Sequence, residues 1–145
     1  MLVKLGYDLD SKEVKSLISY FKNYLIGMQL NDDAHDWKED MERGHLSTVV
    51  VMLLQDFKEK YPNKKEIDLN KDMKKLEEVF WFETIVRAGN TCINYTKKSR
   101  RALKSIKIFE DITPLLKFVD ITENSAKEAL KEQKNTLDFL KTYKG

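Results

Sequence analysis

The side chains most able to do chemistry in this sequence gather in one acidic segment, residues 31–45. It holds six carboxylates and both histidines of the chain, His35 and His45. On one helix His35, Glu39 and Glu42 would share a face, because residues four and seven apart lie one above another. A metal site needs three or four converging ligands. His45 would lie about 15 Å further along a straight helix, so the sequence predicts neither a metal site nor a cofactor.

A second chemistry open to this segment is phosphoryl transfer through a histidine ring nitrogen. The stretch "AHDWKED" is similar to the phosphohistidine segment of histidine phosphotransfer domains, in which Ala-His precedes a lysine, and Ala34, His35 and Lys38 match. The triplet "HDW" also resembles the active-site helix of the sporulation phosphotransferase family. The resemblance implies a helical bundle with His35 as the candidate catalytic residue. These domains place a glycine after the lysine, where this chain has Glu39.

The carboxylates also have a structural explanation, because negative charge stabilises the first turn of a helix by about 0.3–1 kcal/mol per side chain. In a helix that begins near Asp33, this residue could be the N-cap. Six acids within eleven residues exceed what a cap needs. The surplus predicts a docking face for a basic protein partner, made of Asp36, Glu39, Asp40 and Glu42.

The second charged segment, "KKSRRALKSIK" at residues 97–107, carries six positive charges and no acid. Such a stripe can neutralise phosphates without reading sequence, although helix-turn-helix, zinc-finger and RNA-binding aromatic motifs are absent. It could equally be a solvated helix face or a contact for an acidic protein. Its candidate binding residues are Lys97, Lys98, Arg100, Arg101 and Lys104.

Two enzyme families share short patterns with the chain. "RAGNTCINY" resembles the Arg-then-His motif of HEPN nucleases, with Arg87 at the arginine position and Cys92 at that of the histidine. Without the histidine the general acid–base step has no evident agent. Glu39 and Glu42, taken with Glu77 and Glu78, resemble the paired acids of all-α nucleotide pyrophosphohydrolases.

Length and composition predict one soluble domain over residues 1–145, since 41% of the residues are hydrophobic and 34% charged. The single cysteine, Cys92, excludes an internal disulfide and indicates a reducing, cytoplasmic location. No secretory signal is present, and the longest clean apolar run, residues 49–54, is far too short to span a membrane. Residues 1–72 carry a net charge of −3 and residues 73–145 one of +5, so the chain could bind a charged partner or a second copy of itself.

Helical periodicity dominates the chain. We expect a helix over residues 11–30 whose inward seam, with a near-heptad spacing, is Val14, Ile18, Phe21, Leu25 and Met28.

Further helices are predicted over residues 33–61, with a kink or break at Gly44, and over 70–88, with an end or a continuation at Gly89. The repeated triplet "DIT" predicts a short helix over 113–119 and a last helix from 122 or 125 to 143. The fold class is therefore all-α, an antiparallel bundle of four long helices plus one short helix.

The sequence contains no complete catalytic constellation, and it favours a small cytoplasmic binding protein over an enzyme. Such a regulator, inhibitor or adaptor would act on a protein partner through its charged patches. Nucleic-acid binding through residues 97–107 and phosphotransfer through His35 remain alternatives, and a homo-oligomer is also open.

Overall fold

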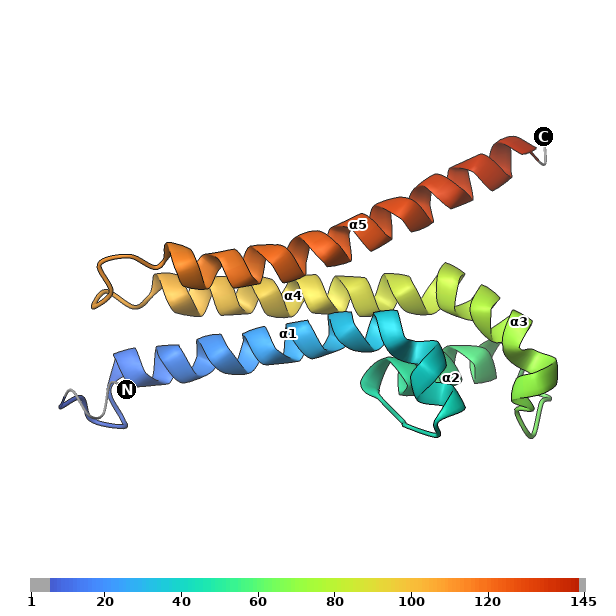
Figure 1. Ribbon diagram of the computed structural model, residues 1–145, viewed down its shortest axis with the longest axis horizontal. Helices are drawn as coiled ribbons and strands as arrows, with labels where there is room; N and C mark the ends of the chain where they lie inside the picture. Colours follow the sequence, from blue (N-terminus) through green and yellow to red (C-terminus); the bar gives the residue numbers. More distant parts are fainter. Residues whose placement is uncertain (1–5, 144–145) are drawn as a thin grey trace.

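The computed structural model describes residues 6–143 and confirms the all-α class (Figure 1). No strand occurs between these residues. The helices are α1 (Lys12–Glu42), α2 (Thr48–Lys60), α3 (Leu69–Val79), α4 (Ile85–Lys104) and α5 (Thr113–Tyr143). A π-helical segment, η2 (Phe80–Thr84), joins α3 to α4. The predicted count of four long helices and one short one is therefore slightly off, because α1, α4 and α5 are long while α2 and α3 are shorter.

The three long helices lie side by side, with α4 between α1 and α5 (Figure 1). Helices α2 and α3 pack near the C-terminal end of α1, and the last turns of α5 diverge from α4. One buried cluster joins α1, α2, α3 and the start of α4, around Leu53, Phe57 and Leu76. A second cluster, around Tyr20, Leu103 and Val119, holds the other end of the three long helices together.

Helix α1 runs unbroken through residues 31–42, so the predicted helix boundary near residue 31 is wrong. The chain has no glycine or proline there to stop it. The first stop is Gly44, whose φ of +72° favours glycine. The N–H of Gly44 donates to Met41 O (3.1 Å) and that of His45 to Asp40 O (2.7 Å), the pattern of a Schellman C-cap. The acidic segment therefore ends a helix rather than beginning one.

At two other predicted helix boundaries, Gly89 and the second "DIT", the helix continues without a break. Helix α4 passes through Gly89, where a Cβ would lie only 3.0 Å from the side chain of Leu130 on α5. A glycine at this position thus allows close packing of the two helices. Helix α5 is continuous from Thr113, and the second "DIT" lies inside it, with Thr122 donating back to Phe118 O (3.3 Å). The separate short helix at 113–119 does not exist.

Candidate protein-binding surface

The predicted inward seam of α1 mostly faces outward. Val14 is buried, but Ile18, Phe21 and Leu25 are 58%, 45% and 50% exposed. The expectation that this seam belongs to the core is therefore wrong for its three central residues. Apolar residues occupy two faces of α1, and periodicity alone does not tell which face meets the rest of the chain.

The face of α1 that packs on α4 is built from a mixture of aromatic, small and polar contacts. Tyr20 is 1% exposed, and its backbone carbonyl accepts a hydrogen bond from Ser99 Oγ (3.0 Å). Two turns on, Gly27 lies against α4, where Cys92 Sγ donates to Gly27 O (3.2 Å). Burial raises the pKa of the Cys92 thiol to about 11. These contacts turn the Ile18–Leu25 side of α1 away from α4.

Helix α5 completes the exposed surface. Phe118 and Ile121 are 52% and 59% exposed, and the ring of Phe118 lies 6.3 Å from that of Tyr24 on α1. Tyr20 Oη donates to Leu115 O (3.0 Å), which holds the start of α5 beside α1. We call Ile18, Phe21, Leu25, Phe118 and Ile121 the α1–α5 face.

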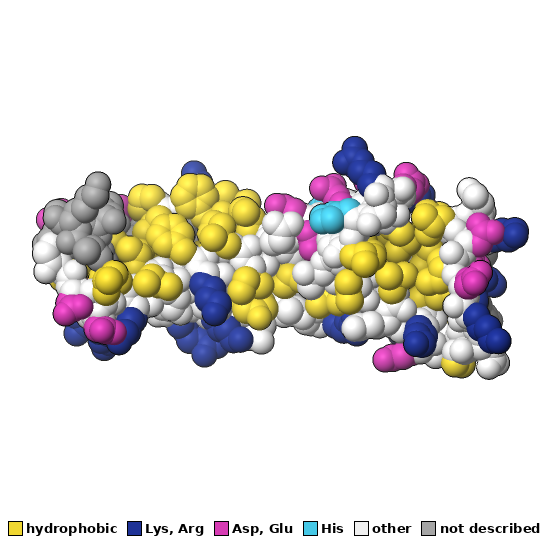
Figure 2. Space-filling view, turned by 90° about the horizontal axis from the view of Figure 1, so that it is seen from below, with side chains coloured by type: hydrophobic (Ala, Val, Ile, Leu, Met, Phe, Trp, Pro, Cys, Tyr) yellow, Lys and Arg dark blue, Asp and Glu magenta, His cyan; other side chains and the backbone are white. Residues whose placement is uncertain are grey.

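Figure 2 shows hydrophobic side chains gathered on the half of the molecule that contains the start of α1 and of α5, and a second group of them on the other half, beyond the histidine. Phe118 and Ile121 were not recognised from the sequence as site residues. Phe118 and Ile121 are spaced three residues apart on a helix. The same spacing is typical of buried core residues, so the sequence did not mark them as exposed.

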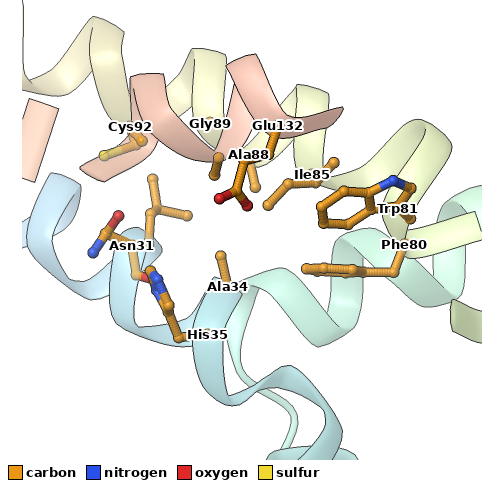
Figure 3. A pocket seen from close by; sticks show the side chains of 13 residues that line it. Asn31, Ala34, His35, Phe80, Trp81, Ile85, Ala88, Gly89, Cys92 and Glu132 are labelled. Atoms are coloured by element: carbon orange, nitrogen blue, oxygen red, sulfur yellow. The ribbon is translucent and has the colours of Figure 1, made fainter. Parts of the chain in front are cut away.

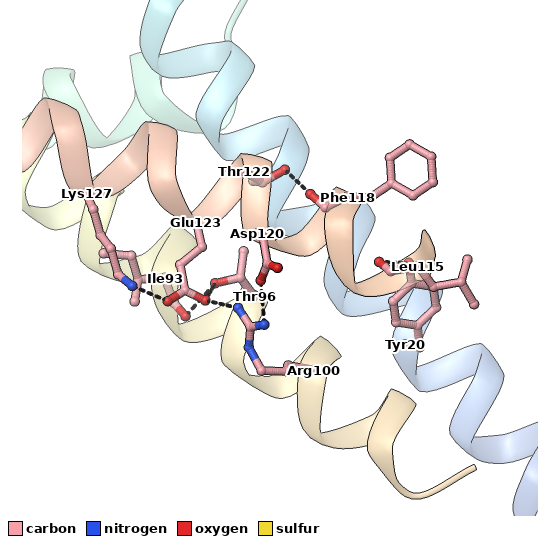
Figure 4. A network of polar contacts seen from close by, with 10 residues as sticks. All are labelled: Tyr20, Ile93, Thr96, Arg100, Leu115, Phe118, Asp120, Thr122, Glu123 and Lys127. Carbon is pink, nitrogen blue, oxygen red and sulfur yellow. Dashed lines mark hydrogen bonds and ion pairs between the residues drawn. The ribbon is translucent and has the colours of Figure 1, made fainter. Parts of the chain in front are cut away.

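One predicted binding residue of the basic stripe, Arg100, is committed to the fold (Figure 4). Its guanidinium pairs with Asp120 (2.5 Å) and Glu123 (2.7 Å) on α5, and Lys127 also pairs with Glu123 (2.5 Å). Thr96 Oγ1 donates to the same carboxylate (3.3 Å). Burial raises the pKa of Glu123, but its bonds to Lys127 and Arg100 outweigh this and leave the pKa below the usual value. This network fixes α5 on α4.

The rest of the basic stripe is available at the surface. Lys98 Nζ lies 4.8 Å from the centre of the Tyr95 ring, a cation–π distance. Lys97, Arg101 and Lys104 are exposed and form no ion pair within the part of the chain that the structure describes. The five predicted cations thus do not act as one patch.

The acid that sequence reasoning treated as a local cap, Asp33, is 4% exposed and lies inside α1. Its Oδ1 accepts from Gln29 Nε2 (2.6 Å), and its Oδ2 accepts from the backbone N–H of Thr48 (3.1 Å). Thr48 is the first residue of α2. Asp33 therefore caps a helix, but one that begins fifteen residues later.

The predicted acidic docking face is partly neutralised by its neighbours. Glu39 pairs with Arg43, and Asp40 with His45 (3.1 Å). The hydrogen bond from His45 is the main cause that lowers the pKa of Asp40. The Arg43 cation offsets part of the unfavourable effect of acids near a helix C-terminus. Asp36 and Glu42 remain exposed and unpaired among residues 6–143, so the face is smaller than predicted.

His35 is exposed on α1, and its Nδ1 lies 2.7 Å from the carbonyl oxygen of Asn31. Because a carbonyl oxygen only accepts, Nδ1 carries a hydrogen, and in the neutral ring Nε2 carries the lone pair. His35 can therefore accept a hydrogen bond or a proton through Nε2. No second acid–base residue contacts it within the described chain.

The HEPN-like pair does not form a catalytic site. Arg87 pairs with the buried carboxylate of Asp56 (2.9 Å) and donates to Gln55 (3.0 Å). Cys92 points instead to Gly27 O, and its raised pKa keeps the thiol protonated near neutral pH. Both residues serve packing between helices.

Within residues 6–143, no group of three or more histidine, cysteine, aspartate or glutamate side chains could hold a metal ion. None of the helices in this part of the chain is long and apolar enough to cross a bilayer. Comparisons with protein-family models, with curated proteins and with solved structures find no match for the chain. The case for function therefore comes from this surface alone.

Proposed function

We propose that this protein works by binding another protein, and that the α1–α5 face takes an amphipathic helix of that partner. The single observation behind this proposal is the exposure of the α1 seam. Large apolar side chains at near-heptad spacing are what one helix presents to another, yet no element within residues 6–143 covers them.

The size of the face supports a specific contact. Five large apolar side chains, each about half exposed, leave roughly 500 Å² of apolar surface, which is at the upper end of what monomeric proteins expose in one patch. A helix laid along α1 and α5 would cover it by the helix-in-groove mode. It would also occupy the fourth position beside α1, α4 and α5, as in a four-helix bundle.

Acidic residues at one end of the α1–α5 face predict how the partner helix is oriented. The exposed side of α1 that carries Leu25 continues after seven and eleven residues to Asp32 and Asp36, both exposed. The partner helix should therefore be apolar along one stripe and basic at the end that meets these carboxylates. This keeps part of the predicted acidic docking face, now as the flank of an apolar contact.

Affinity capture tests the proposal, with the full-length tagged chain as bait in a lysate of its source and mass spectrometry of the retained proteins. We expect Phe21→Glu with Ile121→Glu to abolish capture. Docking of the partner helix would bury both new carboxylates in an apolar contact, which is unfavourable. The retained partner should contain an amphipathic helix with a basic end, and a synthetic peptide of that helix should bind the wild type directly.

The matched control is Val51→Glu on α2, a side chain 40% exposed and remote in sequence from this face. It should leave capture unchanged. Light scattering of the purified protein identifies a second copy as the occupant if Phe21→Glu converts a dimer to a monomer. Capture that survives the double change on the α1–α5 face would refute the proposal.

Phosphotransfer is supported by one observation, the exposed His35 ring with its lone pair held on Nε2. Against it, the exposed carboxylates of Asp32 and Asp36 lie within one turn and would repel a phosphoryl group. We therefore expect phosphodonor kinases and acetyl phosphate to leave His35 unmodified. Acid-labile phosphate that disappears in His35→Gln would favour phosphotransfer over protein binding.

A further inference from the structure

A cavity of about 170 Å³ opens between α1, α5 and the start of α4, separate from the α1–α5 face (Figure 3). Four alanines from these three helices keep it empty, where larger side chains would fill the space. They are Ala34, Ala88, Ala126 and Ala129. An apolar cavity of about 150 Å³ is large enough to hold benzene.

One end of the cavity is aromatic. Phe80 and Trp81 line it, and both belong to the π-helical segment η2. Such a segment inserts an extra residue into a helix and changes the direction of its side chains, and it is frequent at functional sites. The Phe80 ring is held by stacking on Trp37, with the ring centres 4.7 Å apart, so the aromatic wall is preformed.

Three of the other lining residues, Asn31, His35 and Glu132, carry polar side chains. Glu132 of α5 lines the cavity, and Figure 3 shows its carboxylate directed toward the space between the helices. This carboxylate has no hydrogen-bond or ion-pair partner within the described residues. His35 lines the same cavity and offers Nε2 as its acceptor nitrogen when neutral. The exposed carboxylates of Asp32 and Asp36 on the adjoining turns of α1 add negative potential.

From this geometry we infer that the cavity binds a small primary amine with an aromatic or compact alkyl body. The apolar body occupies the space between the alanines and contacts the Trp81 indole. The ammonium group donates to the Glu132 carboxylate and to His35 Nε2. An anionic analogue of the same size would be repelled by the Glu132 carboxylate.

Three probes of similar size test the inference on the full chain: 2-phenylethylamine, neutral ethylbenzene and anionic phenylacetate. Nuclear magnetic resonance of the Trp81 indole reports occupancy, and calorimetry gives the affinity. We expect the amine to bind at least about tenfold more tightly than phenylacetate, a modest ratio for one charge-assisted contact. Glu132→Gln should remove this preference and leave ethylbenzene binding unchanged.

Glu128→Gln, one turn earlier on α5 and also exposed, is the matched control and should keep the preference. Ala129→Leu should fill the cavity and block binding of both the amine and ethylbenzene. If this variant fails to fold, Glu132→Gln still tests the amine preference, because the Glu132 side chain is exposed and its replacement should not disturb folding. The inference is overturned if no probe shifts the Trp81 signal, if phenylacetate binds as well as the amine, or if Glu132→Gln keeps the preference. These results do not depend on the partner proposed for the α1–α5 face.

Discussion

Replacing Asp33 with alanine tests the tertiary role of the acidic segment most directly. The carboxylate is 4% exposed and accepts two hydrogen bonds, from Gln29 Nε2 at 2.6 Å and from Thr48 N at 3.1 Å. Ser47, the residue at the N-cap position of α2, makes no capping bond with its own side chain. Asp33 therefore supplies the side-chain cap that α2 lacks locally.

The expected loss of stability follows from these contacts. Removing an N-cap costs about 1 kcal/mol, and leaving a buried donor without an acceptor costs roughly 1–3 kcal/mol. Because the two overlap at Thr48, we expect Asp33→Ala to lower the free energy of unfolding by about 2–3 kcal/mol. In a chain of this size that corresponds to a melting temperature roughly 6–10 °C lower. Asp33→Asn retains an acceptor for Thr48 N–H and should recover about half of the loss.

Urea unfolding followed by far-ultraviolet circular dichroism measures the change, with the slope against urea unchanged if the native surface is preserved. The matched control is Asp36→Ala, three residues on and exposed, which should stay within about 0.5 kcal/mol of the wild type. If both acids merely started their own helix, the two variants would lose similar amounts. Equal losses would therefore refute the assignment of Asp33 as the cap of α2.

Three further predictions concern the other polar groups. Because the pKa of Glu123 is lowered in the fold, its contribution to stability is present above its unfolded pKa of about 4.3 and is lost as the pH falls through the lower folded value. Glu123→Gln should thus be less stable than the wild type at pH 7, with a difference that shrinks in acid unfolding series below about pH 4; a constant difference would contradict the ion-pair network. Cys92, with a pKa of about 11 and a buried side chain, should resist a thiol reagent at pH 8 until urea unfolds the protein, and rapid labelling of the native state would contradict its burial. Any binding of nucleic acid should be weak and salt-sensitive and should disappear in Lys97→Glu with Arg101→Glu; tight binding that survives this change would locate the interface elsewhere.

The fold class and several helix ends could be predicted from the sequence. Helical periodicity, few glycines and prolines, and one cysteine predicted an all-α chain, which the structure confirms. Pro62 correctly predicted that α2 ends near residue 61. Gly44 correctly marked the break between α1 and α2. These features succeed because they act through the backbone of a few neighbouring residues.

Helix ends that are not marked by a glycine or proline were harder to predict from the sequence. The acids of residues 32–36 have the composition of a helix start, and "DIT" at residues 120–122 has that of a cap. Both lie inside long helices, since tertiary packing overrides a weak local preference. The prediction that Asp33 caps a helix beginning at its own position is wrong, because its carboxylate accepts from the backbone N–H of Thr48 at the start of α2.

Which face of each helix is buried depends on tertiary packing and could not be predicted from the sequence. Helix α1 has apolar residues on two faces, and a sequence pattern gives their spacing but not their partner. The fold packs the face of Tyr20 and Gly27 on α4 and leaves the better-spaced seam of Phe21 exposed. In the same way, Arg100 forms ion pairs with α5, whereas Lys97 is exposed at the surface. The choice depends on contacts between residues 65 to 95 positions apart, such as Gly27 with Cys92 and Tyr20 with Leu115, and no local pattern encodes those.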